Sequence, residues 1–259
     1  MFEQSEAQIL GDPMPGGFSI VIATPTVRAT LMAPYVRSLF DLQSICAARD
    51  IEVKLLLLAN VSSIDFARNI LCSQFLYQTQ CSHMLFIDDD MGFNPEELAR
   101  MFDWRDSEVV AAMCPKRSID WTRIKQAVLA HPDIEPAKLA QLGGDYKGMF
   151  YLPDNAPTMT VGPQPMEVDA IGTGIMMISR ACLMMLLAGG TIPTTTSHLT
   201  LDHPMHNFFS TTKEHGEDHN FCHTVRRHGG KVLGCPWLTV THTGQYDFVG
   251  DIKGIAEYS

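Results

Sequence analysis

The sequence predicts an α/β fold with a mainly parallel central sheet and helices on both faces. Within about a hundred residues, short apolar runs alternate with segments whose apolar residues recur every three or four positions. The apolar runs are nearly continuous, as in strands buried on both faces. The chain of 259 residues is 46% hydrophobic and 19% charged, which is enough apolar surface for a sizeable core.

The first half of the chain supplies the alternating elements. The first strand, Phe18 to Ala23, should stop at Thr24-Pro25. Asn94 and Pro95 are typical of a helix cap and of the first helical position. Further upstream, Ser62 or Ser63 can cap the helix expected at 63–78. Strands are expected at 18–23, 51–60, 83–87 and 108–113, with helices at 30–49, at 63–78 and from 95 onward.

The second half is less regular. Residues 118–165 lose the alternation and suggest a loop-rich insertion with one short helix near 136–142. A strand pair leading into a helix is expected across 166–190, then a helix at 217–228 and a final strand at 231–242. We expect a flexible leader (1–17) and a single domain (18–259), whose parts are 18–117, the insertion and 166–259.

Composition narrows the class of protein. The chain has 19 basic and 29 acidic residues, a formal charge of −10, which argues against nonspecific nucleic-acid binding but does not exclude a local basic groove. The seven cysteines form no close pair and indicate reduced, mostly buried thiols. The polar leader is unlike a signal peptide, and Ser179 and Arg180 interrupt the most apolar stretch, so a cytoplasmic protein is expected.

Three adjacent acids are the strongest chemical feature. Asp88, Asp89 and Asp90 directly follow the apolar strand 83–87. If the strand continues, Asp88 and Asp90 share one face. Two carboxylates at a strand end suit Mg²⁺ or Mn²⁺, and their mutual repulsion favours a bound cation over the alternative of a solvated acidic turn.

A second group of candidates lies near the end of the chain. Glu217 and Asp218 begin a predicted helix, where acids favour the helix dipole. His219 and His223 share a helix face and raise the alternative of a zinc site, although the spacing is not that of HExxH. His242 ends the last strand and is either structural or a ligand for Mn²⁺.

The order of these motifs resembles the GT-A glycosyltransferases of the family-two type, particularly small stand-alone enzymes of phages and bacteria. The resemblance runs from Phe18 to about Phe248 and is weakest at 118–165. It rests on TPT-x-R after the first strand, AR-N in the second helix, FIDDDM, AAMCPKR, VDAIGTGIMMISR, GEDHNF and a terminal T-H-T-G.

The resemblance implies a role for each candidate residue. Asp88 and Asp90 would hold a divalent cation, Mn²⁺ or Mg²⁺, against the diphosphate of a nucleotide sugar, with His242 as a third ligand. Asp218 would be the general base that activates the acceptor hydroxyl, and Glu217 is the alternative. The residues expected to contact the nucleotide sugar are Thr24, Pro25, Arg28, Asn60, Arg68, Asp88, Asp89, Asp169, Gly172 and Gly174.

The function expected from the sequence is therefore metal-dependent transfer of a sugar from a nucleotide-sugar donor to an acceptor hydroxyl, with inversion. The acceptor stays open among a modified DNA base, a polysaccharide and a small molecule. One alternative is a sugar nucleotidyltransferase, but the segment ATPTVRA lacks the glycine-rich loop of that group. The other is a non-catalytic nucleotide- or carbohydrate-binding module, which has no need of the Glu217-Asp218 pair.

Overall fold

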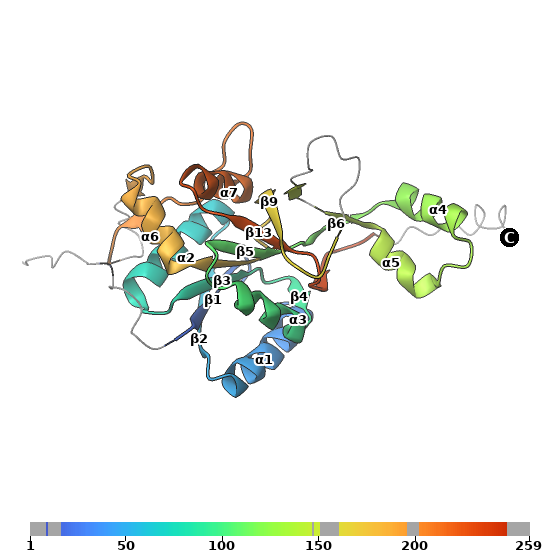
Figure 1. The fold of residues 1–259 in the computed structure, drawn as a ribbon, viewed down its shortest axis with the longest axis horizontal. Coiled ribbons are helices and arrows are strands. Elements are labelled where there is room, and N and C mark those ends of the chain that lie inside the picture. Colours follow the sequence, from blue (N-terminus) through green and yellow to red (C-terminus); the bar gives the residue numbers. More distant parts are fainter. Residues whose placement is uncertain (1–8, 10–16, 147, 151–160, 196–201, 248–259) are drawn as a thin grey trace, which may run out of the picture.

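The computed structural model describes residues 9, 17–146, 148–150, 161–195 and 202–247, so nearly all of the predicted leader lies outside the described residues (Figure 1). Within them, eight strands form one sheet in the order β2-β1-β3-β10-β5-β13-β9-β8. The sheet strands are β1 (Ser19–Thr26), β2 (Glu52–Ala59), β3 (His83–Ile87), β5 (Val109–Ala112), β8 (Gly148–Phe150), β9 (Met166–Ile171), β10 (Ile175–Ser179) and β13 (Val232–Cys235).

The strand directions bring the carboxyl ends of β1, β2, β3, β5 and β13 to one edge of the sheet. β1 is parallel to both β2 and β3, and β13 is parallel to β5. β10 runs antiparallel between β3 and β5, so β5 points the same way as β3. This arrangement confirms the mainly parallel sheet; β9 pairs antiparallel with β13 and β8 at its far side.

Helices cover both faces of the sheet, as the sequence predicts (Figure 1). Along β1, Ile20 and Ile22 join one hydrophobic core and Val21 and Ala23 join the other. The first core includes residues of α1 (Ala33–Ala48), α3 (Pro95–Ala99) and the short 3₁₀ helix η1 (Arg100–Trp104). The second includes residues of α2 (Ile64–Gln78), α6 (Arg180–Ala188) and α7 (Glu217–Arg227).

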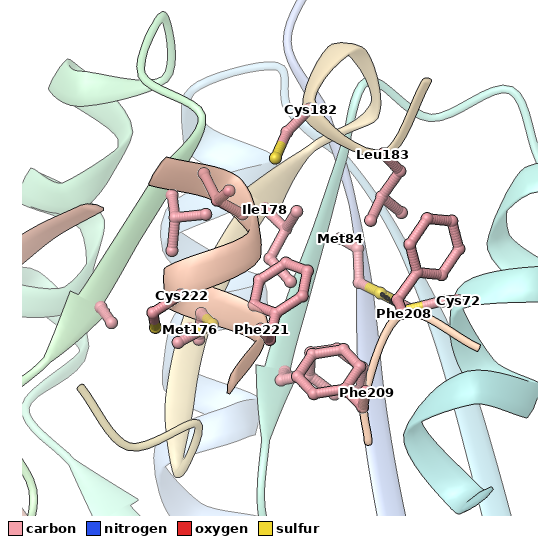
Figure 2. Packing of buried hydrophobic residues seen from close by; sticks show 14 of the residues in the cluster. Cys72, Met84, Met176, Ile178, Cys182, Leu183, Phe208, Phe209, Phe221 and Cys222 are labelled. Carbon is pink, nitrogen blue, oxygen red and sulfur yellow. Dashed lines mark hydrogen bonds between the residues drawn. The ribbon is translucent and has the colours of Figure 1, made fainter. Parts of the chain in front are cut away.

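The second core fixes the start of α7. Figure 2 shows Phe221 and Cys222 of α7 beside Met176 of β10 and near Phe209. The rings of Phe209 and Phe221 stack with centroids 4.4 Å apart. Because all four side chains are almost fully buried, α7 cannot move without opening the core, and its first turn is held rigidly at the sheet edge.

The final strand of the sequence prediction is two strands. β13 ends at Cys235, a turn follows, and β14 (Val240–His242) pairs antiparallel with β4 (Met91–Phe93) instead of joining the sheet. The indole of Trp237 in this turn donates to the Glu97 carbonyl at 3.1 Å, which holds the turn against α3. The break places His242 next to the chain that leaves the three acids.

The insertion contains a helix that the sequence prediction missed. α4 (Trp121–Ala130) is capped by Asp120, whose side chain accepts from the backbone N–H of Arg123 at 2.9 Å. None of its residues is buried, and Trp121 is 61% exposed, so α4 lies outside both cores, although Trp121, Ile124 and Val128 recur at helical spacing. The short helix expected near 136–142 is present. The remaining elements are η2 (Pro136–Lys138), α5 (Leu139–Leu142), β6 (Pro115–Ile119), β7 (Gly144–Tyr146), β11 (Thr194–Thr195) and β12 (Met205–His206).

The cysteines are free thiols, as expected, and all but the half-buried Cys114 are buried. Burial raises the pKa of the Cys222 thiol to about 12, so it stays protonated at neutral pH. Among the helices of the described residues, none combines the length and the apolar character needed to cross a membrane.

Candidate active site

The three acids lie in a turn, not on a strand. β3 ends at Ile87, and the Met91 N–H donates to the Asp88 carbonyl at 3.1 Å to close the turn. The expectation that Asp88 and Asp90 share a strand face is therefore wrong, because the chain must reverse here to pair β4 with β14. The Asp88 N–H donates to the Gly174 carbonyl at 2.9 Å, which joins the turn to the link between β9 and β10.

Asp88 faces a buried arginine. The Arg68 Nη2 lies 3.3 Å from both carboxylate oxygens of Asp88, and Arg68 is 3% exposed. Its guanidinium lies over the rings of Phe86 and Phe209, 6.0 and 5.8 Å from their centroids. Burial, together with the charge of Asp90, raises the pKa of Asp88 to about 6, although Arg68 opposes the shift.

Asp90 faces a different set of groups. Its Oδ2 lies 3.0 Å from Arg117 Nη1 and 3.4 Å from His242 Nε2. Burial acts to raise the pKa of Asp90, but the hydrogen bond and charge of His242 and the charge of Arg117 outweigh it, so this pKa is lowered. The hydrogen bond with Asp90 in turn raises the pKa of His242, whose Nδ1 donates to the Pro115 carbonyl at 2.7 Å.

The carboxylates of Glu217 and Asp218 have different surroundings, since Glu217 is bound in an ion pair and Asp218 is more open. Glu217 Oε1 lies 2.5 Å from Arg68 Nη1, so the same guanidinium contacts Asp88 and Glu217. Asp218 accepts the His219 N–H at 2.8 Å and, within the part of the chain that the structure describes, forms no ion pair. The geometry favours Asp218 over Glu217 as the carboxylate able to take a proton from a ligand.

The two glycines between β9 and β10 have different surroundings. Among the described residues, a Cβ on Gly172 would meet only Asp218 Oδ2, at 3.7 Å, which leaves space above this glycine. A Cβ on Gly174 would lie 3.3 Å from Cys114 Sγ and 3.6 Å from Met91 Sδ. Gly172 therefore suits the close passage of a ligand, whereas Gly174 serves internal packing.

The residues expected around a base and ribose are split between the interior and the surface. β1 extends through Thr26, so Thr24 and Pro25 lie in the strand and not on a loop. Thr24 is fully buried, with its Oγ1 2.7 Å from the Tyr35 hydroxyl. Pro25 is tolerated because β1 has lost its β3 neighbour at that point.

Only part of that set is positioned to contact a ligand. Arg28 and Asn60 are exposed at the carboxyl ends of β1 and β2, and Asn60 takes a left-handed φ of 64° that asparagine tolerates. Asp89 is half-buried beside the other two acids. Arg68, being buried, offers a ligand almost no surface.

Asp169 lies apart from the acidic turn. Its Oδ1 is 3.2 Å from Arg226 Nε, and its Oδ2 is 3.8 Å from His223 Nδ1, both on the outer side of α7. It lines a separate cavity with these residues. From the sequence, Asp169 was expected to contact the donor sugar together with Gly172 and Gly174. In the structure, Asp169 contacts side chains of α7 instead of facing the space above Gly172.

A metal site is not preformed among the described residues: no group of three or more His, Cys, Asp or Glu side chains is arranged to hold an ion. His219 and His223 likewise have no third such side chain in place among the described residues, so the structure adds no support to the zinc alternative. Asp88 and Asp90 each contact an arginine instead. The donor set of two carboxylates and an imidazole nevertheless suits Mn²⁺ or Mg²⁺.

Unpartnered polar atoms also surround the acidic turn. Arg68 Nε, Thr173 Oγ1 and Thr243 Oγ1 are buried and have no hydrogen-bond partner in the described part of the chain. Such atoms are rare in folded proteins because each costs about 1–3 kcal/mol. Thr243 donates its N–H to the Asp90 carbonyl, so the unpartnered hydroxyl lies near the acid. Because protein atoms enclose these groups, they offer a ligand no surface in this structure.

Sequence reasoning missed Arg117 as a site residue. Arg117 follows β5 in β6, and its side chain lies across Gly244, where a Cβ would approach Arg117 Cδ to 2.8 Å. The only signal was a basic pair, Lys116 and Arg117, directly after an apolar strand, and that signal does not say which acid it meets.

Comparisons with known proteins give only distant structural similarity. No protein-family model matches the sequence. No curated protein matches it either. Solved structures do match: A197 from STIV has a TM-score of 0.47 at 15% identity and covers 91% of this chain and 98% of its own.

Two further matches are weaker. A glycosyltransferase involved in the glycosylation of the major capsid of PBCV-1 has a TM-score of 0.31 at 11% identity, covering 64% of this chain and 63% of its own. HddC from Yersinia pseudotuberculosis has a TM-score of 0.29 at 10% identity, covering 64% and 78%. At these scores the similarities do not assign a function to the chain.

Proposed function

We propose that the protein transfers a sugar from a nucleotide-sugar donor to an acceptor hydroxyl. The observation that carries the proposal is the position of Arg68, whose guanidinium contacts both Asp88 and Glu217. Arg68 thus connects two parts of the site. One is the acidic turn, which suits a cation bound to phosphate, and the other is the start of α7, which carries the carboxylate of Asp218. A leaving diphosphate and an attacking hydroxyl need these two kinds of group close together.

Asp88 and Asp90 would hold the divalent cation, and His242 lies close enough to Asp90 to join them when Arg117 moves aside. When bound, the cation supplies positive charge that stabilises the departing phosphate. Arg117 is able to move because its side chain is 58% exposed. Its guanidinium can then pair with a phosphate of the donor in place of Asp90.

Asp218 would accept the proton of the acceptor hydroxyl through its open Oδ2, which faces the space above Gly172. Its Oδ1 stays occupied by the His219 N–H, which holds the carboxylate in one orientation. Glu217 has a positioning role, since its ion pair with Arg68 fixes the first turn of α7. A single displacement assisted by one base inverts the anomeric configuration.

The base and ribose of the donor would lie at the carboxyl ends of β1 and β2. Arg28 and Asn60 offer exposed polar groups there, and Asp89 would contact the donor from the acidic turn, whose Asp89 carbonyl accepts the Met32 N–H at 3.0 Å. Thr24 contributes indirectly, because its hydroxyl holds Tyr35 and so fixes α1 against β1.

The test is donor cleavage. Purified protein with Mn²⁺ is incubated with a panel of uridine, guanosine and cytidine sugar nucleotides, and the released nucleotide is measured with water as the acceptor. Asp218→Asn should lower release by about 10²-fold while leaving donor binding unchanged. Lys125→Gln, on the exposed α4, is the control. If no sugar nucleotide is bound or cleaved, the proposal is wrong.

A further inference from the structure

A cavity of about 660 Å³ lies on the outer side of α7, beyond Asp169. Its walls are the segment 212–215, the α7 side chains from Asn220 to Arg227 that face outward, and Asp169 of β9. Its lining includes His215 and Asn220, three residues before and two residues after Asp218. Asp218 itself does not line the cavity, so a ligand bound there has to extend past the start of α7 to reach that carboxylate.

The charge of this cavity differs from that of the whole chain. Three basic side chains, Lys213, Arg226 and Arg227, line it against two acidic ones, Asp169 and Glu214. The whole chain has 19 basic and 29 acidic residues. Arg226 is committed to Glu167 and Asp169, but Lys213 and Arg227 have no carboxylate partner in the described ranges. Among the described residues, the cavity thus has two cations, Lys213 and Arg227, and one carboxylate, Glu214, outside any ion pair, which leaves it a net positive charge.

Histidines add hydrogen-bonding capacity at the same place. The rings of His215 and His223 lie 4.6 Å apart, and His223 Nε2 is a buried atom without a partner among the described residues. Burial lowers the pKa of His223, and the nearby His215 and Arg227 lower it further, although Asp169 opposes them. The negative charge of a bound anion would oppose these effects and raise the pKa of His223.

We propose that this cavity binds the acceptor by a phosphate group, held between Lys213 and Arg227 with His223 as a donor. The acceptor hydroxyl then reaches Asp218. The description of the ligand as an acceptor rests on the function proposed above, whereas the binding of phosphate does not. Phosphate suits the site because it accepts several hydrogen bonds at once and Arg and Lys are its usual partners.

The test is a titration with inorganic phosphate in EDTA, followed by NMR of the histidine ring protons. The resonances of His215 and His223, assigned with single His→Gln variants, should shift saturably, and the pKa of His223 should rise as phosphate binds. Lys213→Gln and Arg227→Gln should each weaken phosphate binding by about three- to tenfold. Lys125→Gln should not change it, and glucose should cause no shift.

The outcomes separate the two proposals. Asp90→Asn should abolish Mn²⁺-dependent nucleotide binding yet leave the phosphate shifts intact, because Asp90 does not line the cavity. A lack of saturable shifts in the wild type, or equal phosphate affinity in the Lys213→Gln and Arg227→Gln variants, overturns the phosphate site. Failure of nucleotide binding in the wild type, with normal phosphate shifts, instead overturns the glycosyltransferase proposal.

Discussion

Two buried arginine side chains contact opposite ends of α2 and differ in the groups that they contact. Arg68 and Arg180 are each 3% exposed, and each lies over a phenylalanine ring. Arg180, from the start of α6, donates to backbone carbonyls of Phe75, Leu76, Thr79 and Cys81 at 2.8–3.3 Å. Arg68, near the start of α2, contacts two carboxylates from distant segments.

The two arginines therefore differ in the chemistry of their partners, which are backbone carbonyls for Arg180 and carboxylates for Arg68. Arg180 satisfies carbonyls that the end of a helix leaves unpaired, and it complements the negative end of the helix dipole. Arg68 lies near the positive end of the same helix, where the dipole does not favour it, and is retained there by acids that can also bind a ligand.

Replacing Arg180 should give the largest effect on stability. Arg180→Met removes the donor of several buried carbonyls and should lower the free energy of unfolding by about 3 kcal/mol or more. Urea denaturation followed by circular dichroism measures it. Arg100→Met, at an exposed arginine that lies over Trp237, should cost less than about 1 kcal/mol. Equal losses in the two variants would contradict the structural role of Arg180.

Replacing Arg68 should separate activity from stability. Arg68→Met leaves Asp88 and Glu217 without their cation, so turnover should fall by about 10²-fold, since the two parts of the site lose their common partner. The free energy of unfolding should change by less than in Arg180→Met, because Asp88 and Glu217 keep some contact with water. Normal turnover per folded molecule in Arg68→Met would show that Arg68 is only structural.

Asp88, the acid beside Arg68, should also make the stability of the protein depend on pH. The pKa of Asp88 is about 6 in the folded protein and near 3.9 when unfolded. A raised pKa means that Asp88 contributes most stability below pH 4 and that this contribution is lost as the pH rises through 6. In EDTA, urea midpoints should reveal a loss on the order of 1 kcal/mol, which Asp88→Asn removes. The same pH slope in Asp88→Asn would contradict this assignment.

Replacing Arg117 should have the smallest effect. Its ion pair with Asp90 is largely exposed and competes with any cation at that carboxylate. Arg117→Gln should therefore tighten Mn²⁺ binding without nucleotide by about threefold, measured by isothermal titration calorimetry. Weaker Mn²⁺ binding in Arg117→Gln would show that Arg117 does not compete for the site.

The sequence predicted the sheet and the position of the acids because both depend on local patterns. The run His83–Ile87 is apolar throughout, so a buried strand ending at Asp88 was evident without the structure. The start of α7 at Glu217 and the proximity of His242 to the acidic turn also agree with the sequence prediction. In each case a strand or helix boundary coincides with a polar residue.

The remaining features depend on long-range contacts. The pairing of Arg68 with Glu217 joins residues 149 positions apart, and no spacing rule reveals it. The turn at Asp88–Asp90 exists because β4 must meet β14. α4 was missed although its apolar residues recur at helical spacing, and the contacts of Asp169 with His223 and Arg226 of α7 depend on packing that the sequence does not reveal.

The most direct test of the account is Mn²⁺-dependent nucleotide binding at the acidic turn. Electron paramagnetic resonance measures free Mn²⁺ while the protein is titrated in the presence of a nucleoside diphosphate, for the wild type and for Asp90→Asn. The account predicts that the wild type removes Mn²⁺ from solution more strongly with the nucleotide present than without it, and that Asp90→Asn loses this effect while keeping its fold. Equal Mn²⁺ and nucleotide binding by the two proteins would contradict it.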